Sequence, residues 1–271
     1  MPGSEAQIAS VKTIGRVATV LRALAAGSGA GMRLSEVSAA IGLGKATVHR
    51  LMGALVEVGY VEYDETSRLY RLGYALFALG AAARRFHIVD LARPALTRLA
   101  AQTGDTIYLS LRDGDEALCV DRCTGSFPIR TLTLDIGARR PLGVGAGSLA
   151  LLAFQRDADI ARVLASGHAA RRDFAGFDAE QLSGMIEITR RKGYALNDGR
   201  IVRAMMAIGV PVRDGAGRVL ASLSLAAIRE RFEGARLEEL VEALRQEAVA
   251  LGHRLDHRNQ ITAEQLPEFA T

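Results

Sequence analysis

The apolar positions of residues 34–72 follow a helical period twice and then switch to the period of a strand. A first helical run ends at Gly42, and a second begins at Lys45 and ends at Gly59. In residues 60–72 apolar and polar side chains alternate on either side of a polar tip, which predicts a β-hairpin. Two helices joined by a glycine-containing turn and followed by a hairpin are typical of a winged helix-turn-helix, a DNA-reading unit.

The second of these helices is expected to bury one side and expose the other. Val48, Leu51 and Met52 share the apolar side, and the opposite side is small and positively charged. Such a face suits a major groove, because small side chains let the helix approach and arginine binds guanine edges or phosphate. An ordinary helical hairpin with a solvated polar face is the alternative. The DNA contacts are predicted at Ser35, Lys45, Ala46, Thr47, His49 and Arg50, and at Arg68 in the hairpin tip.

The rest of the chain alternates between helical and strand patterns. One helix is predicted over residues 11–24 and an alanine-rich one over 73–86. Helices that flank an antiparallel sheet of five or six strands indicate an α+β domain after the second of these. The predicted strands are 106–112, 117–122, 130–134, 207–213 and 219–225, and the predicted helices are 88–102, one from about 148, 157–165, 179–192 and 237–255.

The helix-turn-helix region contains a characteristic series of residues: Gly42, Leu43, Thr47, Arg50, Leu51, Leu55, Gly59, Tyr60, Tyr70, Leu72 and Gly73. This series resembles the amino-terminal domain of IclR-type bacterial transcriptional regulators. The resemblance implies a winged helix-turn-helix domain over residues 8–73, a linker helix over 74–88, and a GAF-like effector-binding and oligomerisation domain over 89–258. In that last domain a mixed or antiparallel sheet is expected to be flanked by helices.

The charge of the chain is unevenly placed. The 271 residues carry a net charge of +4, and residues 1–85 alone hold 10 Lys and Arg against 6 Asp and Glu. The remainder of the chain is neutral, so a polyanion is expected to bind the amino-terminal part, and double-stranded operator DNA is such a polyanion.

The sequence does not predict a membrane span, because it contains no run of about 18 apolar residues. Its first residues do not resemble a secretory signal. A cytoplasmic protein without a membrane partner is expected.

The two cysteines are Cys119, in the predicted strand 117–122, and Cys123, directly after it. A regular strand places them on the same face about 13 Å apart, which is too far for a disulfide. Reduced thiols are therefore expected.

Two features of the second domain suggest a small-molecule site. The glycine-rich loop 143–147 leads into a helix, whose free N–H groups can hold a carboxylate or phosphate. Tight packing of that helix on a sheet explains the glycines equally well. Ser222 and Ser224 share one face of a strand, where they either bind a ligand or meet solvent.

The resemblance implies that small organic acids bind at positions occupied here by Asn197, Ala207, Ser224 and Ala226. These side chains are mostly less polar than the family's, and Met205 lies nearby, so a larger, more apolar ligand such as an aromatic acid is expected. Three arginines, 112, 130 and 203, are unranked candidates to bind its carboxylate. The predicted ligand-binding residues are Ala146, Gly147, Ser148, Asn197, Met205, Ala207, Ser222 and Ser224.

The sequence does not indicate an enzyme. The serine in the glycine-rich loop lacks the G-x-S-x-G setting of a nucleophile, and the five histidines are dispersed. We therefore predict no catalytic residue, metal or cofactor. The expected function is a regulator whose operator affinity is modulated by a small organic effector, acting as a homodimer or as a homotetramer, a dimer of dimers. A regulator without a ligand, and an enzyme or binding module with an accessory helix-turn-helix, are the alternatives.

Overall fold

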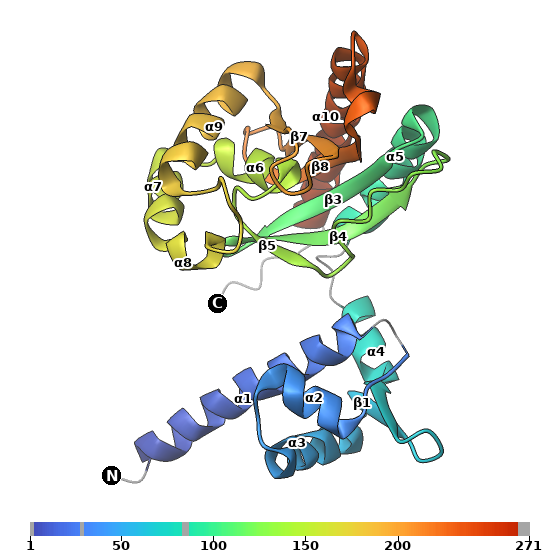
Figure 1. The fold of residues 1–271 in the computed structure, drawn as a ribbon, viewed down its shortest axis with the longest axis vertical. Coiled ribbons are helices and arrows are strands. Elements are labelled where there is room, and N and C mark those ends of the chain that lie inside the picture. Colours follow the sequence, from blue (N-terminus) through green and yellow to red (C-terminus); the bar gives the residue numbers. More distant parts are fainter. Residues whose placement is uncertain (1–2, 28–29, 83–86, 265–271) are drawn as a thin grey trace. The chain divides into compact units, whose positions relative to one another are not determined.

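The structure, a computed structural model, describes residues 3–27, 30–82 and 87–264. They form two compact units that divide between residues 86 and 87, and each unit has its own core (Figure 1). Within these ranges, no helix is long and apolar enough to cross a membrane.

The first unit is a winged helix-turn-helix. Gly42 ends the first helix of the motif with a φ of 66°, a left-handed conformation that glycine adopts without strain. Val48 and Met52 are fully buried, which confirms the side of the second motif helix, the recognition helix, that was expected to face the core. Val37 of the first motif helix is fully buried as well. The elements are α1 (Gly3–Ala26), α2 (Leu34–Ile41), α3 (Lys45–Glu57), β1 (Val61–Asp64), β2 (Leu69–Leu72) and α4 (Tyr74–Ala82).

The second unit is an α+β domain built on a six-stranded sheet in the order β5-β4-β3-β8-β7-β6, with every pairing antiparallel. Its strands are β3 (Thr106–Asp113), β4 (Glu116–Thr124), β5 (Arg139–Pro141), β6 (Ala195–Asn197), β7 (Met205–Arg213) and β8 (Val219–Ile228). Its helices are α5 (His87–Thr103), α6 (Ala146–Ala153), α7 (Asp157–Ser166), α8 (His168–Arg171), α9 (Ala179–Lys192), the 3-10 turn η2 (Arg229–Phe232) and α10 (Arg236–Glu264).

Helices cover both faces of this sheet (Figure 1). α5 and α10 pack on one face, where apolar residues of both helices join those of β3, β7 and β8 in the main core. α6 lies on the other face against β7 and β8, with α9 and α7 outside it. All eight residues of α6 are buried, so this short helix is an internal layer of the domain.

One predicted strand is wrong. Residues 130–134 are irregular, and the sheet instead gains the short edge strands β5 and β6. The alternating pattern has another cause, because Thr131 is buried while Leu132 is 51% exposed. Side chains, not a neighbouring strand, bind the carbonyl groups of this segment: Tyr108 donates to Thr131 O, and Arg122 to Leu134 O.

The expected placement of the cysteines on one face is also wrong. Leu109 pairs with Asp121 and Ser110 with Cys119, which leaves Val120 as an extra residue in β4. Such a β-bulge reverses the alternation of side chains beyond it. Cys119 therefore packs with Tyr108 on one side of the sheet, and Cys123 packs on the main core on the other.

The final helix is longer than its apolar pattern. The stripe on the core side ends at Leu255, where we expected the helix to stop, but α10 continues to Glu264. Helical periodicity predicts a helix only as far as its apolar stripe continues, so it did not predict these last residues of α10.

Candidate functional site

The exposed face of α3 gathers the predicted DNA-binding side chains of the recognition helix. Lys45, Ala46, His49 and Arg50 are exposed and Thr47 is half-buried. In the described part of the chain, neither Lys45 nor Arg50 has an acidic partner. Their charges are therefore free to attract phosphate or to reach base edges. Ser35 is exposed in the first turn of α2, where helix N–H groups also attract phosphate.

The hairpin tip that carries Arg68 is held in a fixed turn. Asp64 accepts hydrogen bonds from the Ser67 hydroxyl at 2.7 Å and from the N–H groups of Thr66 and Ser67. These bonds, led by that of the Ser67 hydroxyl, lower the pKa of Asp64 to about 2. Arg68 itself is exposed and has a φ of 56°, the left-handed conformation that this turn requires.

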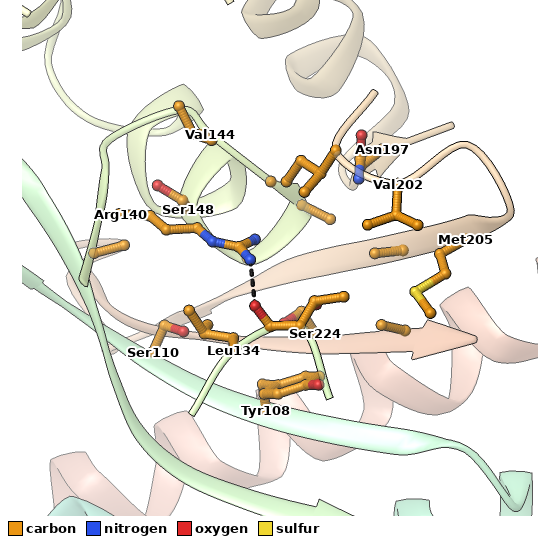
Figure 2. Close-up of a pocket in the computed structure, with 18 of the residues that line it drawn as sticks. Tyr108, Ser110, Leu134, Arg140, Val144, Ser148, Asn197, Val202, Met205 and Ser224 are labelled. Carbon is orange, nitrogen blue, oxygen red and sulfur yellow. Dashed lines mark hydrogen bonds between the residues drawn. The ribbon is translucent and has the colours of Figure 1, made fainter. Parts of the chain in front are cut away.

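In the second unit, a cavity lies between the amino-terminal end of α6 and the sheet (Figure 2). Seven of the eight predicted ligand-binding residues line it, and Ser222 does not. Ser222 is fully buried behind the cavity wall, and its hydroxyl has no hydrogen-bond partner. The serine face of β8 is covered by α6, so the alternative that it meets solvent is wrong. The lining residues are Tyr108, Ser110, Ala117, Thr133, Leu134, Arg140, Val144, Gly145, Ala146, Gly147, Ser148, Asn197, Ile201, Val202, Met205, Met206, Ala207, Ser224 and Ala226.

The glycine-rich loop leads into α6, which packs closely on the sheet, and its role in binding an anion stays a prediction. Gly143 and Gly145 adopt φ values of 94° and 87°, which turn the chain into α6. Because α6 begins at Ala146, the N–H groups of its first three residues have no partner within the helix. They lie at the cavity wall and carry the positive end of the helix dipole.

Ser148 has a structural role in this loop. Its hydroxyl donates to the Pro141 carbonyl at 3.0 Å and accepts from the Gly143 N–H at 3.0 Å. Both bonds close the loop that precedes α6. Although Ser148 lines the cavity, its hydroxyl is already engaged.

Two glycines let α6 approach the sheet. A methyl group on Gly147 would lie 2.8 Å from Ser224 Oγ, and one on Gly209 would lie 2.5 Å from the Ala146 carbonyl oxygen. The second contact is with backbone, which cannot rotate away. Gly209 therefore sets the depth at which the α6 amino terminus sits above β7.

We expect Gly209→Ala to lower the free energy of unfolding by about 1–3 kcal/mol, the usual range for a forced contact in a packed core. Gly184→Ala is the matched control, because a methyl group there meets nothing within 4 Å on helix α9. That change should raise stability by about 0.5–1 kcal/mol. Urea unfolding of the two variants measures both values, and equal stabilities would show that the α6–β7 contact is not tight.

Arg140 supplies the cavity with a positive charge (Figure 2). Among the described residues that line the cavity, none is Asp or Glu, and Arg140 has no ion pair. Its Nη2 donates to the Thr133 carbonyl at 2.5 Å. Burial lowers the pKa of the guanidinium, which still remains charged at neutral pH. A desolvated cation without a counter-ion favours an anion in the same cavity.

None of the three arginines expected to bind a carboxylate lines the cavity. Arg112 bonds to Gln155 and lies 3.7 Å from Asp159, and Arg130 and Arg203 are exposed. Sequence reasoning missed Arg140, although its position in a short strand before the glycine-rich loop was a usable signal. Alternation along that strand turns Arg139 outward, where it pairs with Asp113 and Glu116, and Arg140 inward.

The remaining polar groups of the cavity are oriented but uncharged. Asn197 accepts a hydrogen bond from the Arg200 N–H at 3.2 Å through Oδ1, which leaves its amide nitrogen on the cavity side (Figure 2). Burial raises the pKa of Tyr108 to about 12, so its hydroxyl stays protonated and donates to Thr131 O. Val202 and Met205 lie across the cavity from the arginine (Figure 2), and Met206 also lines the cavity. The cavity thus has a positively charged end and an apolar end.

Comparisons with known proteins agree with both units. The model of the bacterial transcriptional regulator IclR C-terminal domain matches residues 80–253, and that of the IclR helix-turn-helix domain matches residues 13–65. The chain is 31% identical over 240 residues to the HTH-type transcriptional regulator KdgR of Escherichia coli strain K12, which covers 87% of this chain and 89% of KdgR.

Two solved structures share the fold. An IclR transcriptional regulator from Alicyclobacillus acidocaldarius superposes with a TM-score of 0.76 at 27% identity, over 89% of this chain and 98% of that one. An IclR homologue from Microbacterium hydrocarbonoxydans, crystallised in complex with 4-hydroxybenzoate, superposes with a TM-score of 0.75 at 25% identity. That superposition also covers 89% of this chain and 98% of the homologue.

Proposed function

This chain belongs to the IclR family of bacterial transcriptional regulators, and we propose that a small organic carboxylate in its second unit controls the affinity of its first unit for an operator. Binding DNA is the shared activity of the family's helix-turn-helix regulators. The free cations on the exposed face of α3 support Lys45 and Arg50 as contacts with phosphate and base edges. Arg68 at the wing tip is the proposed contact beside the recognition helix.

The observation that carries the effector proposal is the unpaired guanidinium of Arg140 inside the cavity. A carboxylate there accepts charge-assisted hydrogen bonds from Arg140 and faces the amino-terminal dipole of α6. The apolar end, which includes Met205 and Met206, accommodates a ring or an aliphatic group. The bound 4-hydroxybenzoate of the Microbacterium homologue has this combination of a carboxylate and a ring, which makes aromatic acids the first probes.

Replacing Arg140 with methionine is expected to weaken binding of such an acid by about 10-fold to 150-fold. A hydrogen bond to a charged group is worth about 1.5–3 kcal/mol, and methionine keeps the stem of the side chain without its donors. Arg139→Met is the matched control, because its side chain pairs with surface carboxylates outside the cavity. Titration calorimetry with 4-hydroxybenzoate and with aliphatic hydroxy acids measures the change.

Equal affinities of the two variants would contradict the assignment of Arg140. A failure of every acid to bind the unmodified protein would favour the alternative of a regulator that has no ligand. Neither result would affect the DNA-binding proposal, which rests on the first unit.

We further propose that the protein is a homodimer or a dimer of dimers in the bacterial cytoplasm, where an operator is accessible. A palindromic site requires two recognition helices related by two-fold symmetry. α4 is apolar around its circumference, and it leaves Tyr74, Phe77 and Leu79 exposed. A helix of this kind is usually buried, so α4 is the proposed dimer contact of the first unit.

We propose no catalytic activity for this chain. Its relatives are transcriptional regulators.

A further inference from the structure

Residues 129–136, here called the lid, lie in the connection from β4 to β5 and have no regular secondary structure. Thr133 and Leu134 of the lid line the cavity, while Ile129, Leu132 and Ile136 are each more than half exposed. The lid therefore has an inner surface that faces the ligand site and an apolar outer surface.

The lid is held down by side chains that bind its carbonyl groups. Arg140 donates to Thr133 O, Tyr108 donates to Thr131 O, and Arg122 donates to Leu134 O at 3.0 Å. The Thr131 hydroxyl also donates to the Ala226 carbonyl at 2.6 Å. Tyr108 and Arg140 are themselves cavity residues, so two of these bonds originate inside the ligand site.

We propose that Arg140 is a latch that holds the lid closed in the empty protein and releases it when a carboxylate binds. This inference rests on the proposed effector site. It adds that one guanidinium serves two competing acceptors, the lid carbonyl and the ligand.

The competition follows from the geometry of the guanidinium. A carboxylate binds arginine through two parallel N–H donors, which sets the plane of the group, and it brings a negative charge to the guanidinium. The bond to the Thr133 carbonyl is a single bond to a neutral acceptor. Nη2 is the atom that now donates to Thr133 O. A ligand that takes this donor leaves the lid with its Tyr108 and Arg122 carbonyl bonds, the Thr131–Ala226 bond and the Arg122–Asp135 ion pair. Leu134 also stays packed on the Tyr108 cluster.

Release of the lid gives the ligand a differential effect on the conformation of the domain, which any control of a distant site requires. The exposed side chains of Ile129, Leu132 and Ile136 would move with it. Binding at the buried end of the cavity would then change an apolar surface of the second unit.

The absence of tryptophan from the 271 residues provides a direct test. Leu132→Trp places a single fluorophore on the exposed side of the lid, and quenching by acrylamide reports its accessibility. Without any ligand, adding Arg140→Met should raise the quenching constant at least about twofold, because the Thr133 bond is lost. Tyr108→Phe, which removes a single hydroxyl group, should give a smaller increase. Arg139→Met should leave quenching unchanged.

With the single-tryptophan protein, 4-hydroxybenzoate should raise quenching to the level of the Arg140→Met variant and should have no further effect on that variant. Unchanged quenching in ligand-free Arg140→Met would overturn the latch, whatever the protein binds. Binding in the calorimeter without a change in quenching would also overturn it while leaving the effector site in place. An open lid in Arg140→Met, in a protein that binds no acid, would support the latch contact and contradict the proposed function.

Discussion

Replacing Arg50 with alanine is expected to weaken binding to the operator by about 30-fold to 10⁴-fold. One arginine contact with a base edge is worth about 1–3 kcal/mol, and a two-fold symmetric complex loses two of them. Arg50 is exposed on α3 and has no acidic partner in the described ranges, so no intramolecular bond has to be broken for it to reach DNA. Fluorescence anisotropy with an operator fragment, identified by genome-wide footprinting, measures the loss.

Two further variants separate recognition of base edges from electrostatic attraction to the DNA phosphates. Lys45→Ala should weaken binding to operator and unrelated DNA alike and reduce the dependence on salt, as expected for a phosphate contact. Arg191→Ala removes an equally exposed arginine from α9 of the second unit and should change neither affinity. Operator binding that survives Arg50→Ala would show that another face of the first unit reads the sequence.

Replacing Asp105 with alanine is expected to cost about 3–5 kcal/mol of stability, a large part of the total for most domains. Its carboxylate is almost completely buried and pairs with Arg231 at 2.5 Å and with Arg236 at 3.1 Å. Both arginines also donate to the Thr103 carbonyl. Without Asp105, the guanidinium groups of Arg231, 18% exposed, and Arg236, 36% exposed, lose their shared counter-ion.

The comparison variant is Asp113→Ala, whose carboxylate is 57% exposed in its pair with Arg139. Exposed pairs contribute at most about 1 kcal/mol. Urea unfolding should therefore separate the two variants by several kcal/mol, and similar midpoints would contradict the importance of the buried cluster.

The Asp105 cluster also supports the start of the segment that leads to the lid. The Gly125 N–H donates to the Asp105 carbonyl, the Phe127 N–H donates to the Gly104 carbonyl, and Arg231 stacks on the Phe127 ring at 3.9 Å. Loss of the carboxylate should consequently increase quenching of a tryptophan at position 132. The stability of the domain and the behaviour of the lid are thus linked through one buried charge.

The first unit could be predicted almost completely from the sequence, because its elements are specified by neighbouring residues. Gly42 ends a helix by its own conformational freedom, and the spacing of Val48, Met52 and Leu55 defines the buried side of α3. The hairpin and the closing pair β7–β8 were equally clear, since alternation and a polar turn are short-range signals. The family resemblance extended these local patterns to the whole chain.

The second unit depended on contacts that no local pattern contains. Residues 130–134 alternate like a strand, yet they form most of a lid because their carbonyl groups meet Tyr108, Arg122 and Arg140 from elsewhere in the fold. A single bulge at Val120 reverses the faces of β4 and separates the two cysteines. Register and long-range packing decide such features, and sequence periodicity does not report them.

The proposed ligand site shows most clearly which features the sequence determined and which the tertiary structure decided. The sequence predicted the location of this site from two features, the glycine-rich loop before a helix and the two serines on one face of β8. Both are local, because glycine permits the turn and alternation places the serines on the same face. Only the assembled sheet shows that Ser222 lies behind the cavity wall, that the Ser148 hydroxyl is engaged, and that Arg140 is the charge inside. A side chain's charge and size are local properties, but its exposure and its partners are set by segments distant in the chain, so they appear only once the chain has folded.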